Sequence, residues 1–257
     1  MSVQKVFIVH SSKGNIMREP TANKRICVVI PTLNEEKTIN TVVRGFSELA
    51  DHFPLSILVV DGHSSDNTLK FARKAGASVI VQSKRGKGAA MIEAISKTKN
   101  DVYVFIDGDG TYLPSELEQI VSSVLNDKAD MVIGSRFKGK TEKGSIAPIN
   151  ILGNKFFNLI TGLVFNVHTS DIFSGYRAVK KEVLEKINLR SCHFEVEAEM
   201  TVKTIAKGFK VSEVPITYLR RRENSTKLRP FKDGLCIFKT FLIEILREKF
   251  PLCKGVS

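Results

Sequence analysis

The amino-acid sequence predicts an α/β fold, with a mostly parallel sheet flanked by helices in a single domain. From Arg25 onward, short runs rich in Val and Ile alternate with amphipathic stretches, which is the rhythm of a parallel sheet covered by helices. The apolar runs are nearly continuous, as expected for strands that are buried on both faces. A chain of 257 residues is long enough for one such domain with a full core.

Six apolar runs are expected to form the strands, and helix-like segments separate them. The strands cover residues 26–30, 55–60, 78–81, 101–106, 129–134 and 211–218. Ser65 and Asp66 can cap one helix, and Pro114 is typical of the first turn of another. Further helices are expected at about residues 154–165 and 194–207.

The two ends of the chain differ from the middle. Residues 1–24 show no sustained period and are treated as an N-terminal extension, residues 25–234 as the domain, and residues 235–257 as a C-terminal amphipathic helix and tail. Between residues 231 and 250 the side chains of Leu235, Phe238, Leu242 and Ile245 recur at helical spacing beside basic residues. This pattern predicts peripheral association with a membrane, and an ordinary helix packed on the domain is the alternative.

The formal net charge of +12 is concentrated between residues 203 and 232, where nine Lys or Arg oppose two Glu, a net of +7 by subtraction. Such a segment attracts anions, and phosphate-bearing small molecules or an anionic membrane surface fit it. We expect no nucleic-acid partner, because no zinc-finger or helix-turn-helix pattern accompanies the charge. A non-catalytic basic binding module is the competing function from another class.

We expect a cytoplasmic protein, with the cytoplasmic face of a membrane as a second place of action. No secretory signal pattern is present, and charge interrupts every apolar stretch before it reaches the roughly 20 residues of a spanning helix. The four cysteines are far apart, which predicts reduced thiols and no paired metal site.

Acidic residues gather after three of the predicted strands, where open parallel sheets bind their ligands. Asp107 and Asp109 flank Gly108 directly after one strand, while Asp61 and Glu35 follow two others. Two carboxylates spaced across a glycine can share one Mg²⁺ or Mn²⁺ ion and leave positions open for phosphate oxygens. An Asp-Gly turn is the alternative for this pair taken alone. Its placement beside two further acidic strand ends favours the metal.

The remaining acidic and basic strand-end residues each have a functional and a structural interpretation. Asp61 can accept a hydrogen bond from a nucleobase N–H, or it simply begins a turn, and Glu35 is otherwise an ordinary first-turn acid. The Lys-Arg-Gly-Lys-Gly turn at residues 84–88 precedes a helix and can approach a diphosphate, although a solvated basic turn explains it equally well.

Two groups of cations are candidates for phosphate binding. Arg136 ends the fifth strand and is placed to grip a phosphate with two hydrogen bonds. Three consecutive arginines at residues 220–222, followed by Ser-Thr-Lys, offer a second grip. Solvated surface arginines are the alternative for both groups.

The motifs VVIPTLNEE, LVVDGHSSDNT, FIDGDGTYLP, VIGSR, DIFSGYRAV and EVPITY, in this order, resemble those of the family-2 inverting glycosyltransferases of GT-A (Rossmann-like) fold. Within that family the chain looks like the dolichyl- or polyprenyl-phosphate sugar synthases, which handle mannose, glucose or N-acetylglucosamine. The resemblance covers about residues 25–234. It implies a metal-dependent hexosyltransferase that uses Mg²⁺ or Mn²⁺ and moves a sugar from a UDP- or GDP-sugar to a polyprenyl phosphate, with inversion.

The resemblance also implies roles for residues at matching positions. It places the nucleotide sugar at Pro31, Leu33, Glu35, Val60, Asp61, Asp107, Gly108 and Asp109, the metal at Asp107 and Asp109, and the catalytic groups at Asp109, Arg136, Arg220 and Lys227. Arg221 or Arg222 could replace Arg220, because the segment before Ser-Thr-Lys is one residue longer than the family pattern. Leu33, Gly62 and Thr111 stand where an aromatic residue, an Asp and a Gln are frequent, so the sugar and the base stay open.

A transferase with a hydroxyl acceptor, such as a lipid, a polyol or a polysaccharide, is the alternative enzyme. That reaction needs a general base near the acceptor oxygen, for which Asp171, Glu195 and Glu197 are the candidates. Each of the three has a structural alternative, as a turn residue or as the polar side of a helix. A polyprenyl phosphate is already an anion and needs no base, so with that acceptor the cationic residues should matter more for the rate than these carboxylates.

Overall fold

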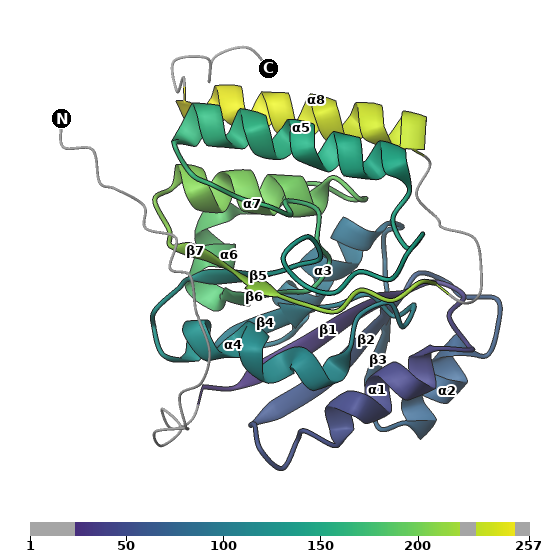
Figure 1. Cartoon of the computed structure of the whole chain (residues 1–257). Helices are drawn as coiled ribbons and strands as arrows, with labels where there is room; N and C mark the ends of the chain where they lie inside the picture. The colour runs from purple at the N-terminus through teal and green to yellow at the C-terminus, as the bar shows by residue number, and fades with distance from the viewer. Residues whose placement is uncertain (1–23, 222–229, 250–257) are drawn as a thin grey trace.

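A seven-stranded sheet with the strand order β3-β2-β1-β4-β6-β5-β7 forms the centre of the computed structural model, which describes residues 24–221 and 230–249 (Figure 1). Only β6 runs antiparallel to its neighbours, β4 and β5. The strands are β1 (Ile26–Thr32), β2 (Leu55–Asp61), β3 (Ser78–Val81), β4 (Val102–Phe105), β5 (Met131–Ser135), β6 (Arg177–Lys180) and β7 (Val211–Pro215). The predicted α/β fold with a mostly parallel sheet is confirmed.

Among the strands of the described residues, β6 is the one that the sequence did not predict. It has four residues, and its first residue, Arg177, pairs with Phe105 at the carboxyl end of β4. Because β6 is antiparallel, the turn that precedes it lies at the same sheet edge as the residues that follow the parallel strands. Residues 171–176 are thereby delivered to the ligand-binding edge of the sheet.

Helices cover both faces of the sheet. One core lies between the sheet and α1, α2 and α4, and a second lies between the sheet and α3, α6 and α7. The helices are α1 (Ile39–Ser47), α2 (Thr68–Lys74), α3 (Lys87–Lys97), α4 (Leu117–Leu125, after the short 3₁₀ helix Pro114–Glu116), α5 (Pro148–Phe165), α6 (Lys181–Ile187), α7 (Val196–Ala206) and α8 (Pro230–Lys249).

Helices α5 and α8 lie side by side and form a further layer over α7 (Figure 1). A third core fills this layer, with Phe157 of α5 packed among Ile237, Phe241 and Ile245 of α8. The predicted C-terminal helix is therefore present and packs on the domain. Of its predicted apolar side chains Ile245 is buried, whereas the other three are exposed. The predicted N-terminal extension and the tail after Lys249 fall outside the described residues, apart from Lys24.

Within the described ranges, no helix combines the length and the apolar character that crossing a bilayer requires.

Candidate active site

A cavity of about 1210 Å³ opens at the carboxyl ends of the parallel strands, where ligands bind in open α/β sheets. Its lining has two parts. The acidic end is formed by strand-end loops and includes Glu35, Asp107 and Asp109. The apolar end is formed by α5, α8 and the segments before β6 and α7, and it includes Leu152, Phe156, Phe157, Phe173, Phe194 and Ile237.

The acid pair sits on a turn directly after β4. Asp109 is held in place by Thr111, whose backbone N–H and hydroxyl donate to Asp109 Oδ1 at 3.1 and 2.7 Å. Burial and the neighbouring charge of Asp107 raise the pKa of Asp109. Gly108 is required between them, because a Cβ there would lie 2.7 Å from Thr32 Cγ2. The turn thus holds two carboxylates close together at the acidic end of the cavity.

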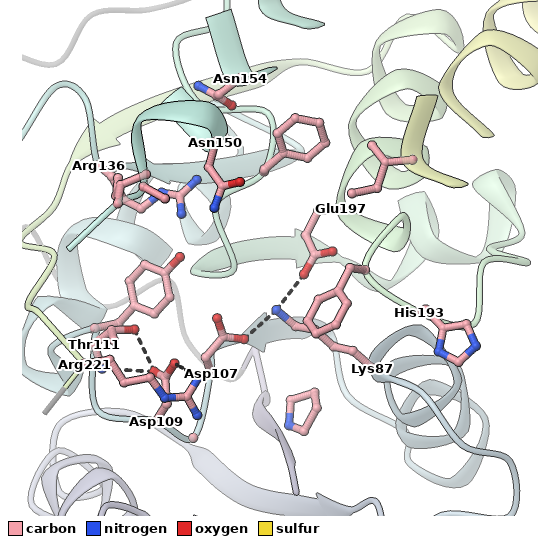
Figure 2. Close-up of a pocket in the computed structure, with 18 of the residues that line it drawn as sticks. Lys87, Asp107, Asp109, Thr111, Arg136, Asn150, Asn154, His193, Glu197 and Arg221 are labelled. Carbon is pink, nitrogen blue, oxygen red and sulfur yellow. Dashed lines mark hydrogen bonds and ion pairs between the residues drawn. The ribbon is translucent and has the colours of Figure 1, made fainter. Parts of the chain in front are cut away.

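Lys87, the first residue of α3, bridges two carboxylates in the cavity (Figure 2). Its Nζ lies 2.5 Å from Asp107 Oδ1 and 2.6 Å from Glu197 Oε1. Burial alone would lower the pKa of Lys87, but the charges of Asp107 and Glu197 raise it, so the ammonium stays protonated at neutral pH. The basic turn at residues 84–88 therefore places a permanent cation at the acidic end.

Arg221, the second arginine of the triple, lines the cavity (Figure 2). Its Nη2 lies 2.5 Å from Glu35 Oε1, and its Nη1 lies 3.3 Å from Asp109 Oδ2. Arg220 is exposed, and its backbone N–H donates to Glu142 Oε2 at 2.7 Å. Of the two alternatives that the structure describes, Arg220 and Arg221, it is thus Arg221 that meets the acid pair. Arg222 and Lys227 lie outside the described residues, so the role of Lys227 stays a prediction.

Arg136 lines the cavity and forms a bidentate ion pair with Asp171. Its Nε and Nη2 donate to Asp171 Oδ2 and Oδ1, each at 2.7 Å, and its backbone N–H donates to Oδ2 at 3.0 Å. The guanidinium also lies over the ring of Tyr218, 5.2 Å from its centroid. Asp171 is fully buried and has both oxygens engaged, so it orients Arg136 and is not accessible as a base.

The other two candidate bases differ in position. Glu197 lines the cavity in the first turn of α7, but its Oε1 is in the ion pair with Lys87. Glu195 does not line the cavity, and its Oε1 accepts the backbone N–H of His193 at 3.2 Å. Glu197 is therefore the single predicted base with access to a ligand.

The predicted nucleoside residues separate into two groups. Pro31, Leu33 and Glu35 line the cavity, and Leu33 is 38% exposed. Val60 and Asp61 are completely buried and do not line it. Asp61 instead accepts the backbone N–H of Ser64 at 2.8 Å and its hydroxyl at 2.5 Å, and so fixes the loop after β2. The structure therefore places Asp61 behind the wall of the cavity.

Two polar residues at the acidic end, Gln82 and Thr32, were not predicted from the sequence. Gln82 follows β3 directly, lines the cavity and is 4% exposed. Thr32 is the last residue of β1 and lines the cavity. Its hydroxyl is buried without a hydrogen-bond partner among the described residues. The same rule that pointed to Asp107 would have found both, because each residue stands at the carboxyl end of a parallel strand.

The start of α5 brings further polar groups to the cavity beside Arg136 (Figure 2). The helix begins after Ala147 without a side-chain cap. Pro148 has no N–H, and the N–H of Asn150 donates to Ala147 O at 2.9 Å, which leaves the N–H of Ile149 for an acceptor. Ser145 Oγ and Asn154 Oδ1 are buried and lack partners within the described residues, and Asn150 also lines the cavity. Buried polar atoms normally have partners, so these groups are suited to a polar ligand.

Comparison with known proteins places the fold and the motifs in context. A family model described as glycosyl transferase family 2 matches residues 27–188, which is more than half of the chain. Glycosyltransferase AglJ of Haloferax volcanii is 38% identical over 215 residues, which are 83% of this chain and 69% of that protein. The dolichyl-phosphate hexose transferase of the same organism is 33% identical over 227 residues, with coverage of 88% and 96%.

Solved structures share the fold. Glucosyl-3-phosphoglycerate synthase from Mycobacterium tuberculosis, in complex with Mn²⁺, UDP-glucose and phosphoglyceric acid, superposes with a TM-score of 0.71. The two sequences are 23% identical, and the match covers 88% of this chain and 81% of that one.

Proposed function

The chain belongs to glycosyl transferase family 2, and from that premise we propose that it transfers a sugar from a nucleoside diphosphate to a polyprenyl phosphate. One observation carries the proposal: a single cavity joins an acidic end, suited to a metal-bound diphosphate, to an apolar end, suited to a lipid. The name of the dolichyl-phosphate hexose transferase, a relative over 88% of this chain, supports the same acceptor class.

The acid pair fits a divalent cation. Asp107 and Asp109 supply hard oxygen ligands. Burial and the charge of Asp107 raise the pKa of Asp109, and a bound cation would favour its ionised form. Bound there, Mg²⁺ or Mn²⁺ would offset charge on the departing nucleoside diphosphate. A structure of the same fold contains Mn²⁺ and UDP-glucose, so Mn²⁺ and UDP-glucose are the first metal and donor to test in a transfer assay. Lys87 and Arg221 add two cations of the chain's own at the same end.

The donor's nucleoside fits the wall formed by Pro31, Leu33 and Glu35. Gln82 and the unpaired hydroxyl of Thr32 offer both hydrogen-bond donors and acceptors there, which a nucleobase edge can use. The sugar would then lie between the acid pair and Arg136, because a metal ion at Asp107 and Asp109 would hold the diphosphate there.

The acceptor phosphate fits beside Arg136 and the uncapped start of α5. Asp171 holds the guanidinium in one orientation, and the helix N-terminus favours an anion. Ser145 and Asn150 supply further polar groups at the same place. The polyprenyl chain would follow the apolar end toward Phe156 and Ile237. We place the reaction at the cytoplasmic face of a membrane, where such an acceptor is presented to a nucleotide sugar.

The reaction in this arrangement is a single displacement. An acceptor phosphate oxygen attacks the anomeric carbon, a new carbon–oxygen bond forms, and the bond to the diphosphate breaks with its electron pair leaving on the nucleoside diphosphate. Attack opposite the leaving group inverts the anomeric centre. The phosphate is already ionised, so no base is required. The cations of the site, Lys87, Arg136 and Arg221, reduce the repulsion between the two anionic substrates.

A hydroxyl acceptor is the second candidate, and one observation favours it. Glu197 lines the cavity 2.6 Å from Lys87 and is positioned near the acid pair, so it has access to an acceptor hydroxyl. With such an acceptor Glu197 would take the proton that the hydroxyl loses.

Two acceptors that differ only in the reacting group separate these candidates. Wild type and Glu197→Gln are assayed with a short polyprenyl phosphate and with the polyprenol of the same chain length, each with Mn²⁺ and a panel of UDP- and GDP-sugars. We expect transfer to the phosphate alone, with Glu197→Gln reduced by about tenfold or less, since Glu197 there only supports Lys87. Transfer to the alcohol that Glu197→Gln abolishes would replace the proposal by the hydroxyl reaction.

A further inference from the structure

Two stripes of exposed apolar side chains run along the outer layer of the fold. Each stripe follows the spacing of one helix face, and every member is at least 39% exposed. The stripe of α5 consists of Ile149, Leu152, Phe156, Leu159 and Leu163, and that of α8 consists of Leu235, Phe238, Leu242 and Leu246. Contiguous apolar surface of this kind marks an interaction site in a folded protein.

The two stripes form one surface, the α5–α8 face. Helices α5 and α8 lie side by side, as Figure 1 shows, and run in the same direction. The rings of Phe156 and Phe238 lie 6.4 Å apart, and Lys249 Nζ lies 5.6 Å from the ring centroid of Phe165. The face therefore runs from Ile149 to Leu163 on α5 and from Leu235 to Leu246 on α8.

Basic side chains predominate around the α5–α8 face. Helix α5 contains no acidic residue. In α8, Glu244 is 4% exposed and turned inward to Lys203 and Arg247, Glu248 pairs with Lys207, and Asp233 lies in the first turn. The cations Lys155 and Lys239 are exposed beside the stripes. Lysine and arginine side chains at the border of an apolar face can reach anionic headgroups while the apolar groups insert below them.

The cavity opens onto this face. Ile149, Leu152 and Phe156 belong to the α5 stripe and also line the apolar end of the cavity. An apolar chain can therefore pass from the face into the cavity without crossing water.

We propose that the α5–α8 face docks on an anionic lipid bilayer and that a lipid acceptor enters the cavity from the bilayer through its apolar end. The docking stands on the stripes and the charges alone. The entry of the acceptor rests on the proposed function. The docking surface differs from the one that the sequence predicts, because α5 supplies half of it and Leu246 stands in place of the buried Ile245.

Vesicle flotation tests the docking with matched variants. Leu246→Glu and Val81→Glu place a charge at side chains that are both 44% exposed, but Val81 lies on the edge strand β3. The double variant Leu163→Glu/Leu246→Glu places one charge on each helix of the face, at two positions that do not line the cavity. With vesicles of phosphatidylcholine and phosphatidylglycerol at low salt, we expect the double variant to lose vesicle binding by about tenfold or more and Val81→Glu to bind like wild type. Circular dichroism and melting verify that each variant is folded.

Three results would overturn the docking: wild type that does not float, a double variant that floats as wild type does, or loss of binding in Val81→Glu as well. A folded wild-type dimer that Leu163→Glu/Leu246→Glu dissociates, without flotation of either protein, would assign the face to a second copy.

Transfer assays test the entry separately. The double variant should keep wild-type transfer to a short, water-soluble polyprenyl phosphate and lose about tenfold or more of transfer to a long-chain acceptor embedded in vesicles. Equal loss with both acceptors would contradict entry through the face. Absence of transfer by wild type with either acceptor would refute the proposed function, while flotation would still decide the docking.

Discussion

Replacing Asp109 by Asn removes one negative charge from the acidic end and retains the side-chain shape. The Asn carbonyl oxygen can accept the two hydrogen bonds that Thr111 now donates to Asp109 Oδ1. Burial and the charge of Asp107 raise the pKa of Asp109 in the folded protein. The contribution of Asp109 to the free energy of unfolding is therefore fully present below its unfolded pKa, and it is lost as the pH rises through the raised, folded-state pKa. We therefore expect Asp109→Asn to be at least as stable as wild type at pH 7.

Asp109→Ala provides the contrast. It loses both hydrogen bonds from Thr111, at about 1 kcal/mol each, which corresponds to a fall in Tm of roughly 4–8 °C for a domain of this size. Transfer should fall by about 10²–10³-fold in both variants, because both lose a carboxylate ligand of the metal that would offset the charge of the leaving diphosphate. Stability and activity are thus expected to separate: Asp109→Asn is stable and inactive.

Melting in the presence of MnCl₂ and UDP, together with kcat for transfer, measures both quantities. Wild type should gain Tm only when metal and nucleotide are both present, and Asp109→Asn should gain little. Retention of activity within a few-fold of wild type in Asp109→Asn, with unchanged dependence on Mn²⁺, would refute the role of Asp109.

The ion pairs of Arg221, Asp171 and Glu199 can each be tested by one substitution. Arg221→Ala should lower kcat/KM by about 10²-fold, because Arg221 meets Asp109, while the exposed Arg220 should tolerate the same change; equal losses would contradict this assignment. Asp171→Asn should cost about 3–5 kcal/mol in urea denaturation, because it leaves the Arg136 charge without its buried partner, and a cost below about 1 kcal/mol would refute that role. Burial would raise the pKa of Glu199, but bonds from Lys203 and Ser191 lower it, so its stabilisation is present above its unfolded pKa and is lost as the pH falls through the lowered value. The Tm deficit of Glu199→Gln at pH 7 should accordingly shrink on acidification.

The sequence predicted those parts of the fold and of the site that depend on neighbouring residues. Apolar runs gave the positions of the parallel strands to within a few residues, because each run is buried as a unit. The acid pair at the end of β4 was predictable for the same reason: Gly108 and the end of the run are local signals. The family resemblance also predicted Pro31, Leu33 and Glu35 as site residues, and all three line the cavity.

The partners of these residues depend on tertiary packing and could not be predicted. Asp171 reaches Arg136 only because the four-residue strand β6 runs antiparallel and turns the preceding segment toward β5. Glu197 meets Lys87 across 110 positions of the sequence, since the starts of α3 and α7 converge at the cavity. Asp61 lies at the end of a strand as Asp107 does. Its carboxylate accepts a hydrogen bond from the Ser64 hydroxyl three residues later, however, and it does not line the cavity.

The identity of the lipid product tests the central claim most directly. Wild-type protein is incubated with Mn²⁺, sugar nucleotides and a short polyprenyl phosphate, and the extracted lipid is analysed by mass spectrometry and by NMR of the anomeric centre. We predict a glycosyl phosphodiester of inverted configuration, formed in a one-to-one ratio with released nucleoside diphosphate. A product in which the sugar is joined to a hydroxyl oxygen, or an anomeric centre of retained configuration, would contradict the account.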